Sequence, residues 1–236
     1  ELEPIDLLIE EINNDDIDIK IDAIHKIPIV AAISGPETTR TKLLQVINDV
    51  LLSEEDELMY AIAVELYNLK DYVGGLVHYD KLLQILEKLA HEQETVVREE
   101  AVKSIIKLAL LMNTQHIRTT LYPMVISLSE SLQFPGKIAA TYLFEVVYPH
   151  LNKDEKDAIR VKFIELFNDE TTLVKRSMSK NLSSFTLVLE KEYIIKEIIP
   201  IILALTKDEN DLIRCNVFES IILLAKKFNK EENSKY

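Results

Sequence analysis

A repeat of about 39 residues runs along the chain and constrains its fold more than any other feature. Six similar segments end at residues spaced 40, 38, 39, 38 and 39 positions apart: Lys20, Tyr60, Arg98, Lys137, Lys175 and Arg214. We call these six residues the anchors. A fixed period of this length is typical of stacked supersecondary units, each of which buries its apolar face against its neighbours. No long linker interrupts the pattern, so we predict one domain over residues 1–236. Its six repeats should occupy about 1–35, 36–73, 74–113, 114–151, 152–190 and 191–229.

Each anchor begins an apolar stripe of helical spacing. Seven residues after the anchors stand apolar side chains: Ile27, Tyr67, Ile105, Phe144, Leu182 and Ile221. Three residues after the first four anchors stand alanines: Ala23, Ala63, Ala101 and Ala140. Offsets of three and seven share one helix face, so each anchor starts the second helix of a repeat, and the alanines allow a neighbouring helix to cross closely. Second helices are predicted at about 17–33, 56–71, 94–112, 135–150, 172–189 and 210–228.

The first helices are predicted at about 4–13, 37–52, 78–91, 115–131, 153–168 and 192–206. Pro123 and Pro200 occupy equivalent positions inside two of these apolar patterns. Proline removes a helix hydrogen bond, so the first helix should bend there. Residues 229–236 are polar and are expected to fray.

Helix pairs of this length favour the HEAT or armadillo class over tetratricopeptide units of 34 residues or ankyrin units of 33. Two helices per repeat, with a proline bend in the first, favour HEAT. The predicted fold class is all-α, an α-α superhelix of the HEAT-repeat solenoid type. In such a stack the turns inside the repeats line up along one edge, and this edge is the first place to look for a binding site.

The chain is acidic, with 40 Asp and Glu against 27 Lys and Arg and a formal net charge of −13. Nucleic acid and anionic membranes need a basic surface, so neither is expected as a partner. No apolar run reaches the length of a membrane span. The single cysteine, Cys215, agrees with a reducing compartment. We therefore expect the protein in the cytoplasm, with the nucleus as a second compartment.

Motifs for catalysis and cofactor binding are not found in the sequence. The five histidines are scattered over different repeats without a close pair, which argues against a metal site. No nucleophile elbow, zinc-protease helix or phosphate-binding glycine loop is present. We predict no catalytic residue, no cofactor, no metal and no small-molecule substrate.

Several segments resemble one family more specifically, in order along the chain and without large gaps. These are 39–44 (TRTKLL), 72–75 (YVGG), 94–102 (ETVVREEAV), 143–149 (LFEVVYP), 173–176 (LVKR) and 197–200 (EIIP). They resemble the scaffolding A subunits of protein phosphatase 2A. The resemblance implies a non-catalytic scaffold that docks regulatory B-type subunits on its N-terminal repeats. The catalytic subunit would bind C-terminal repeats that are absent from this chain, which would then be the N-terminal part of a longer scaffold.

In that family the turns inside the repeats contact the partners, which implies a set of partner-binding residues here. They are Asp56, Glu57, Glu94, Thr95, Gln133, Phe134, Thr171, Thr172, Lys175, Arg176, Asn210 and Asp211. Two positions depart from the family pattern. Gln133-Phe134 stands where a Trp-Phe pair is usual, which removes a large aromatic anchor. Thr172 replaces a proline.

The basic anchors have two competing interpretations. Each could contact a partner, but a salt bridge to the acidic residue of an adjacent turn, forming a ladder between repeats, is the favoured one; such a pair contributes only about 0–1 kcal/mol. Arg176, one residue beyond its anchor, is therefore the better contact candidate than Lys175. The alternative function is a HEAT adaptor such as a nuclear-transport receptor, whose acidic surface would bind basic cargo.

Overall fold

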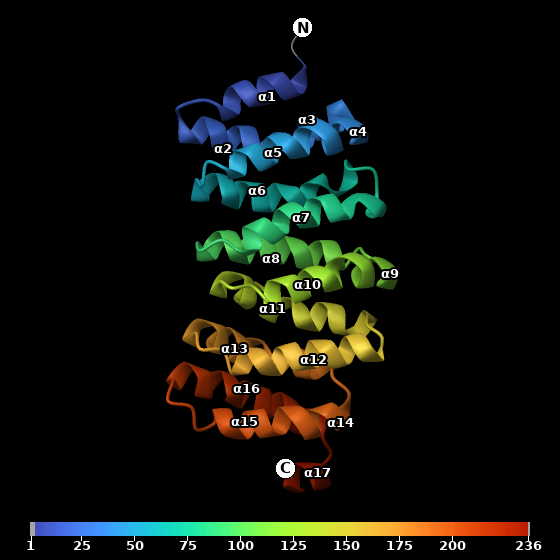
Figure 1. Ribbon diagram of the computed structural model, residues 1–236, viewed down its shortest axis with the longest axis vertical. Coiled ribbons are helices and arrows are strands. Elements are labelled where there is room, and N and C mark those ends of the chain that lie inside the picture. The colour runs from blue at the N-terminus through green and yellow to red at the C-terminus, as the bar shows by residue number, and fades with distance from the viewer. Residues whose placement is uncertain (1–2, 236) are drawn as a thin grey trace. The chain divides into compact units, whose positions relative to one another are not determined.

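The computed structural model describes residues 3–235, and within this range it is helical throughout, without strands. The chain divides into two compact units, Glu1–Met124 and Val125–Tyr236, which we call unit 1 and unit 2. In each unit helix pairs follow one another along the chain (Figure 1). None of the described helices is long and apolar enough to cross a membrane. An all-α HEAT-type repeat is therefore the observed fold, as predicted; the single-domain assignment stays a prediction.

The second helices begin within one residue of the predicted positions. They are α2 (Ile17–His25) with α3 (Ile27–Ser34), α6 (Asp56–Asn68), α8 (Thr95–Ala109), α11 (Phe134–Val147), α13 (Thr172–Val188) and α16 (Asp211–Lys227). Short 3₁₀ turns extend two of them: η2 (Leu69–Asp71) and η5 (Tyr148–His150). The second helix of the first repeat is divided at Lys26, and Pro28 lies in the first turn of α3, where its missing N–H is not needed.

The first helices alternate between two forms. Those of repeats one, three and five are α-helices: α1 (Pro4–Ile12), α7 (Tyr79–Ala90) after the 3₁₀ turn η3 (Leu76–His78), and α12 (Lys153–Phe167). The others each contain a five-residue π turn. They comprise α4 (Pro36–Thr38), η1 (Thr39–Leu43) and α5 (Leu44–Leu51); α9 (Thr114–His116), η4 (Ile117–Leu121) and α10 (Tyr122–Ser129); and α14 (Lys191–Tyr193), η6 (Ile194–Ile198) and α15 (Ile199–Leu205).

The π turns account for the predicted disturbance at Pro123 and Pro200. Each proline lies two residues after a π turn, where its missing N–H removes a helix hydrogen bond. Proline is not required for the turn, because η1 is followed by Gln45 at the same position. There the Thr39 hydroxyl donates to the Gly35 carbonyl at 2.9 Å. Side-chain bonding to the backbone is a second way to open the helix ladder.

Unit 1 is held by close crossings of its second helices. Ala23, Ala63 and Ala101 are completely buried, as expected for positions where α2, α6 and α8 meet. The Ser104 hydroxyl donates to the Ala63 carbonyl at 2.7 Å, so a backbone acceptor of α6 is paired by the next repeat. The alanines three residues after the anchors thus let the backbones of neighbouring second helices approach closely, as their spacing predicts.

A contact in unit 1 explains two of the family-like segments. Arg40, in η1, donates from Nη1 to the Val73 carbonyl at 2.6 Å, across 33 residues of sequence. The next residue, Gly74, has a positive φ of 95°, and a Cβ there would lie 2.4 Å from Arg40 Nη1. Segments 39–44 and 72–75 therefore form one structural contact that fixes the loop between the second and third repeats.

Unit 2 has an aromatic core. Phe163 packs at centroid distances of 5.8 Å from Phe144, 5.2 Å from Phe167 and 4.2 Å from Phe185. Buried polar side chains lie beside it: the hydroxyls of Thr141 and Ser177 are 2.6 Å apart, and Asn181 donates to Thr141 at 3.0 Å. These groups satisfy one another, so burying them does not leave unpaired donors.

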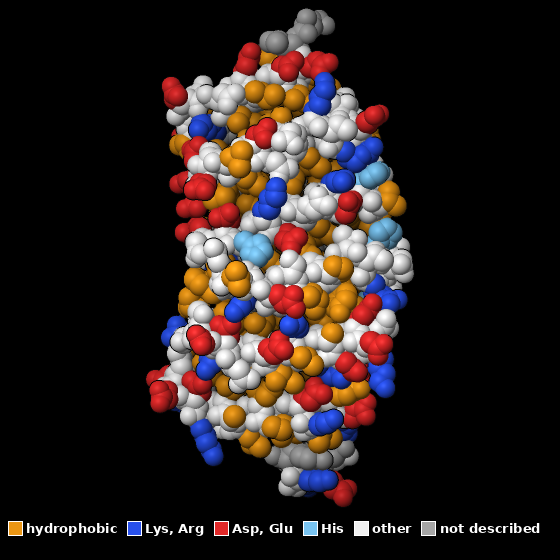
Figure 2. Space-filling view, in the orientation of Figure 1, with side chains coloured by type: hydrophobic (Ala, Val, Ile, Leu, Met, Phe, Trp, Pro, Cys, Tyr) orange, Lys and Arg blue, Asp and Glu red, His pale blue; other side chains and the backbone are white. Residues whose placement is uncertain are grey.

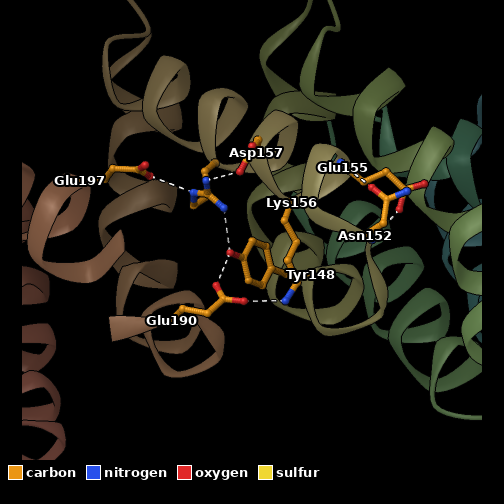
Figure 3. Close-up of polar contacts among 8 residues, drawn as sticks. Tyr148, Asn152, Glu155, Lys156, Asp157, Glu190 and Glu197 are labelled. Carbon is orange, nitrogen blue, oxygen red and sulfur yellow. Dashed lines mark hydrogen bonds and ion pairs between the residues drawn. The ribbon is translucent and has the colours of Figure 1, made fainter. Parts of the chain in front are cut away.

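A polar network in unit 2 links side chains from the fourth, fifth and sixth repeats (Figure 3). The Tyr148 hydroxyl donates to Glu190 at 2.6 Å and accepts from Arg160 Nη1 at 3.1 Å. Lys156 donates to Glu190 at 2.6 Å, and Arg160 Nε donates to Glu197 at 3.1 Å. Burial alone would raise the pKa of Glu190, but the hydrogen bonds from Lys156 and Tyr148 lower it to about 2.

The expectation of a frayed end at 229–236 is wrong for the described part of that segment. Residues Lys230–Lys235 form a short helix, α17, after α16 ends at Lys227. Tyr236 lies outside the described residues. The polar composition of this segment therefore does not exclude a helix.

Lys227 caps the end of α13 by donating to the carbonyls of Thr186, Leu187 and Leu189 at 2.8 to 3.2 Å.

Candidate partner-binding turns

The turns inside the repeats leave all twelve predicted residues at least partly accessible. Seven are exposed: Asp56, Glu57, Glu94, Thr95, Gln133, Thr172 and Asp211; five are half-buried: Phe134, Thr171, Lys175, Arg176 and Asn210. Most lie at the starts of second helices, and two cap their helix with a side-chain hydrogen bond. Glu94 accepts from the Val96 amide, and Asn210 accepts from the amides of Leu212 and Ile213. Capping fixes the direction of these turns, so their side chains stand on a rigid support.

Three predicted residues of unit 1 line one hollow. Asp56 and Glu57 reach it from the start of α6, and Glu94 reaches it from the start of α8. The hollow has a volume of about 660 Å³, and the complete lining is Ile21, His25, Asp56, Glu57, Tyr60, Ala61, Glu94 and Val96. We call it the acidic hollow. Its carboxylates and its apolar floor together suit a basic side chain with an apolar stem.

Acidic residues extend the acidic hollow along the turns. Red side chains gather on the margin of Figure 2 where α6 and α8 begin. The pKa of Glu92 is raised, first by burial and then by repulsion from Asp56 and Glu54. Like charges at this separation disfavour ionisation of the partly buried group. A cationic partner would relieve that repulsion, whereas an anionic one would increase it.

The first turn of unit 2 offers an apolar side chain that the sequence prediction missed. Leu132 is fully exposed, immediately before the predicted Gln133 and Phe134. It is the most exposed large hydrophobic residue among those described. Although this turn lacks the tryptophan of the usual Trp-Phe pair, it therefore still presents an exposed apolar side chain. Leu132 was not among the predicted contact residues because it lies one residue before the Gln133-Phe134 pair that corresponds to the family's Trp-Phe pair.

Exposed apolar side chains also recur two residues before three of the anchors. They are Val96, Leu173 and Leu212, each about half exposed. The offset alone does not identify them, because Leu58, two residues before Tyr60, is buried. Each lies next to a predicted polar contact residue, namely Thr95, Thr172 and Asp211. The turns are therefore mixed surfaces of the kind found at protein interfaces.

Three other predicted residues of unit 2, Thr172, Lys175 and Asn210, line a second hollow of about 450 Å³. It is lined by Thr172, Lys175, Asp208, Glu209, Asn210 and Ile213. Thr171 precedes it as the N-cap of α13, and its amide donates to Asp169 at 2.9 Å. Asp211 pairs with Arg214 one turn further along α16. The fifth and sixth turns thus contribute both signs of charge to one opening.

The predicted ladder forms at two of the basic anchors. Lys20 pairs with Glu55 at 2.9 Å, and Lys137 pairs with Asp169 at 2.6 Å, each in the turn of the next repeat. The arginines bind their own turns instead: Arg98 Nη1 donates to the carbonyls of Glu92 and Gln93, and Arg214 Nη1 donates to that of Asp208. A guanidinium can reach two neighbouring carbonyls at once, which favours this local contact.

The ladder prediction is wrong for Lys175. No salt bridge or hydrogen bond joins its ammonium to a described residue, although Asp208 and Glu209 line the same hollow. Arg176 is half-buried, and its Nε has no hydrogen-bond partner within residues 3–235. Lys175 therefore offers a cation without a direct ion pair to a ligand, whereas the unpaired Nε of Arg176 is buried. The preference for Arg176 over Lys175 has no support in this geometry.

Histidines do not form a metal site in the part of the chain that the structure describes, where no group of three potential ligands occurs. His25 instead lies with Nδ1 2.7 Å from Glu65 Oε1, which belongs to the next repeat. The Asn68 amide also donates to Glu65, at 2.8 Å. The His25–Glu65 contact joins α2 to α6 at the acidic hollow, which His25 also lines.

Known structures support the class of fold. The described helices superpose on an archaeal HEAT-like repeats protein from Thermococcus onnurineus with a TM-score of 0.55 and 18% identity, over 93% of this chain and 86% of that one. Cex1p superposes with a TM-score of 0.58 and 10% identity, over 95% of this chain and 43% of that one. No family model matches the sequence. The fold thus defines a HEAT-type helical repeat protein with an accessible row of turns in each unit.

Sequence relatives make the assignment more specific. The chain is 39% identical over 198 residues to the protein phosphatase 2A scaffold subunit of Dictyostelium discoideum, covering 84% of this chain and 34% of that protein. It is 33% identical over 234 residues to a probable serine/threonine-protein phosphatase PP2A regulatory subunit of Caenorhabditis elegans, covering 99% and 40%. The chain belongs to the family of scaffold (regulatory A) subunits of protein phosphatase 2A, and it spans well under half the length of these relatives.

Proposed function

We propose that this chain is a non-catalytic scaffold segment of a protein phosphatase 2A complex and that its intra-repeat turns dock a regulatory B-type subunit. The observation that carries the proposal is the identity to named scaffold subunits along 84% to 99% of the chain. The accessibility of all twelve turn residues supports it. Phosphoester chemistry would belong to the catalytic subunit, bound to repeats that lie outside this chain.

The two units would contribute different chemistry to the docking surface. The acidic hollow in unit 1 suits basic side chains of the regulatory subunit, because Asp56, Glu57 and Glu94 face one opening without a lining Lys or Arg. The turns of unit 2 offer Lys175, in a hollow that Asp208 and Glu209 also line, and the apolar Leu132. Charge patterns that differ between the turns select the orientation of a partner more than they add to affinity.

A binding measurement with separately purified regulatory and catalytic subunits tests the proposal. The chain should bind the regulatory subunit, and the double variant Lys175→Glu/Arg176→Glu should weaken binding about tenfold or more, equivalent to about 1.4 kcal/mol. Lys196→Glu, an exposed change of the same sign away from the turns, is the matched control and should leave binding unchanged. Capture of the catalytic subunit alone would overturn the proposal, and unchanged affinity of the double variant would remove the fifth turn from the site.

The alternative of an adaptor for basic cargo has one observation in its favour, the acidic hollow. It is not favoured by the relatives, which are named as phosphatase scaffold or regulatory subunits. The two functions separate in the same assay. Tight, salt-sensitive binding of a basic localisation peptide, combined with no binding of a regulatory subunit, would reverse the preference.

A further inference from the structure

A basic groove lies between the first helices of the second and third repeats, in unit 1. It runs between α5 and α7, has a volume of about 470 Å³, and shares no lining residue with the acidic hollow. Polar and basic side chains dominate its lining, among them Arg40, Gln45, Asn48, Lys81, Gln84 and Lys88. We call it the α5–α7 groove. Its floor includes Leu44 and Ile85, which are almost completely buried.

The charge of the α5–α7 groove is opposite to that of the chain. Three cationic side chains line it against one carboxylate, Glu87, whereas the chain carries a net charge of −13. Figure 2 shows Lys and Arg side chains on the face where α5 and α7 lie. A local excess of one sign in a groove focuses the field and favours a ligand of the other sign.

The cations of the groove are mostly not neutralised by carboxylates. Lys88 donates to the neutral amide of Asn48 at 2.7 Å, and Arg40 is held by the Val73 carbonyl. Lys81 pairs with Asp80, the preceding residue of the same helix, at 3.7 Å, and Glu87 precedes Lys88 in the groove lining. Neutral acceptors position Arg40 and Lys88 but leave their charges available to a ligand.

The spacing of the cationic side chains in the α5–α7 groove determines which ligands fit the groove. The Asn48–Lys88 contact shows that a residue of α5 lies beside the residue about forty positions later in α7. Arg40 therefore belongs with Lys81 at one end of the groove, and Lys88 marks the other. Lys81 and Lys88 are seven residues apart on one helix face, which is about 10 Å at 1.5 Å per residue. Three residues of a peptide in the extended polyproline II conformation span about the same distance, at 3.1 Å per residue, and their three-residue turn puts residues i and i+3 on one face.

Gln84 lies between the two lysines. Its amide makes no hydrogen bond with another described residue, and the side chain is exposed at the groove. A primary amide donates and accepts at the same time, so it matches the N–H and C=O groups of a peptide backbone. Together, the two cationic ends and this central amide match an extended chain better than a compact anion.

We propose that the α5–α7 groove binds a short acidic segment of a partner protein, in polyproline II conformation, with two carboxylates three residues apart on one face. One carboxylate pairs with Arg40 and Lys81, the other pairs with Lys88, and the backbone between them bonds to Gln84. This site goes beyond the docking of a regulatory subunit on the turns, because it lies on different helices and selects ligands of the opposite charge.

The test is a fluorescence-anisotropy titration of the chain with labelled eight-residue peptides at low and at physiological ionic strength. The first peptide has glutamates three residues apart, and a matched peptide of the same composition has them adjacent. We expect the spaced peptide to bind at least about fivefold tighter. Lys81→Gln/Lys88→Gln should reduce its affinity about tenfold, and Lys196→Glu should reduce it less than about twofold. Unchanged thermal midpoints establish that the variants fold.

Three outcomes would overturn the proposal. Equal affinity for both peptides would show that spacing is not recognised, and equal losses in the groove and control variants would reduce the effect to net charge. Tighter binding of inorganic phosphate or a short RNA, lost in the same groove variant, would assign the groove to a phosphate ligand. Regulatory-subunit binding, measured separately, should be unaffected by the groove variant, so failure here leaves the docking proposal intact.

Discussion

Unit 1 and unit 2 share one repeat pattern but fill it with different side chains. The core of unit 1 is aliphatic, and its close helix crossings depend on alanines such as Ala63 and Ala101. Unit 2 instead buries a cluster of phenylalanines centred on Phe163, with a hydrogen-bonded polar group around Thr141. The period therefore determines where the helices lie, whereas the size and polarity of the buried side chains determine how each unit is held together.

The largest expected effect tests the aromatic core. Phe163→Ala should destabilise unit 2 by about 3–5 kcal/mol, because it removes three ring contacts and leaves a cavity. Hydrogen-exchange mass spectrometry should show lost protection in residues 125–235 and little change in residues 3–124. Leu66→Ala, at a completely buried position of unit 1, should give the reverse distribution. Equal loss of protection in both units after either change would contradict a difference in how they are stabilised.

A smaller effect tests the loop contact of unit 1. Gly74→Ala pays the cost of a positive φ, about 1–2 kcal/mol, and also displaces Arg40 from the Val73 carbonyl. Gly35→Ala is a matched control, since φ there is 83° and no atom lies within 4 Å of the added Cβ. In urea unfolding, the free energy of unfolding of Gly74→Ala should be lower than that of Gly35→Ala by about 1 kcal/mol or more. Indistinguishable midpoints would mean that the Arg40 contact adds no stability.

The smallest effect is a difference in pH dependence between the units. In unit 2, folding lowers the pKa of Glu190 to about 2, so the stability from its ionised form is present above its ordinary pKa and is lost as the pH falls toward 2. In unit 1, folding raises the pKa of Glu92, so ionisation opposes folding and the penalty is relieved as the pH falls.

The measurement is urea unfolding at a series of pH values, with hydrogen exchange assigning the change to a unit. Lys156→Met should reduce the acid-induced loss in unit 2, because the bond that lowers the pKa of Glu190 is gone. Glu92→Gln should stabilise unit 1 near neutral pH by only a few tenths of a kcal/mol, since the group is partly solvated. A destabilised unit 1 in the second variant would show that the Glu92 carboxylate is favourable where it lies.

The second helices were predictable from sequence because the period and the apolar offsets report the same helix face in every repeat. The π turns were not predictable, since only Pro123 and Pro200 signalled a disturbance and Gln45 stands at the equivalent position after η1. Charge pairing was predicted in part. Lys20 and Lys137 reach the next turn, whereas Lys175 does not, and nothing in the order of residues distinguishes them. Leu132 and the α5–α7 groove required the positions of side chains from separate segments.

The π turns have a consequence for the surface of the first helices. They start at Thr39, Ile117 and Ile194, 78 and 77 residues apart, so they recur in every second repeat. One extra residue in a turn rotates every later side chain by about 100° around the helix axis, given 3.6 residues per turn. The two halves of these helices therefore present differently phased stripes, and alternate repeats carry surfaces that are not translations of one another. Within unit 1, which contains η1 and η4, a partner that lies along the first helices would therefore contact a pattern that recurs in every second repeat.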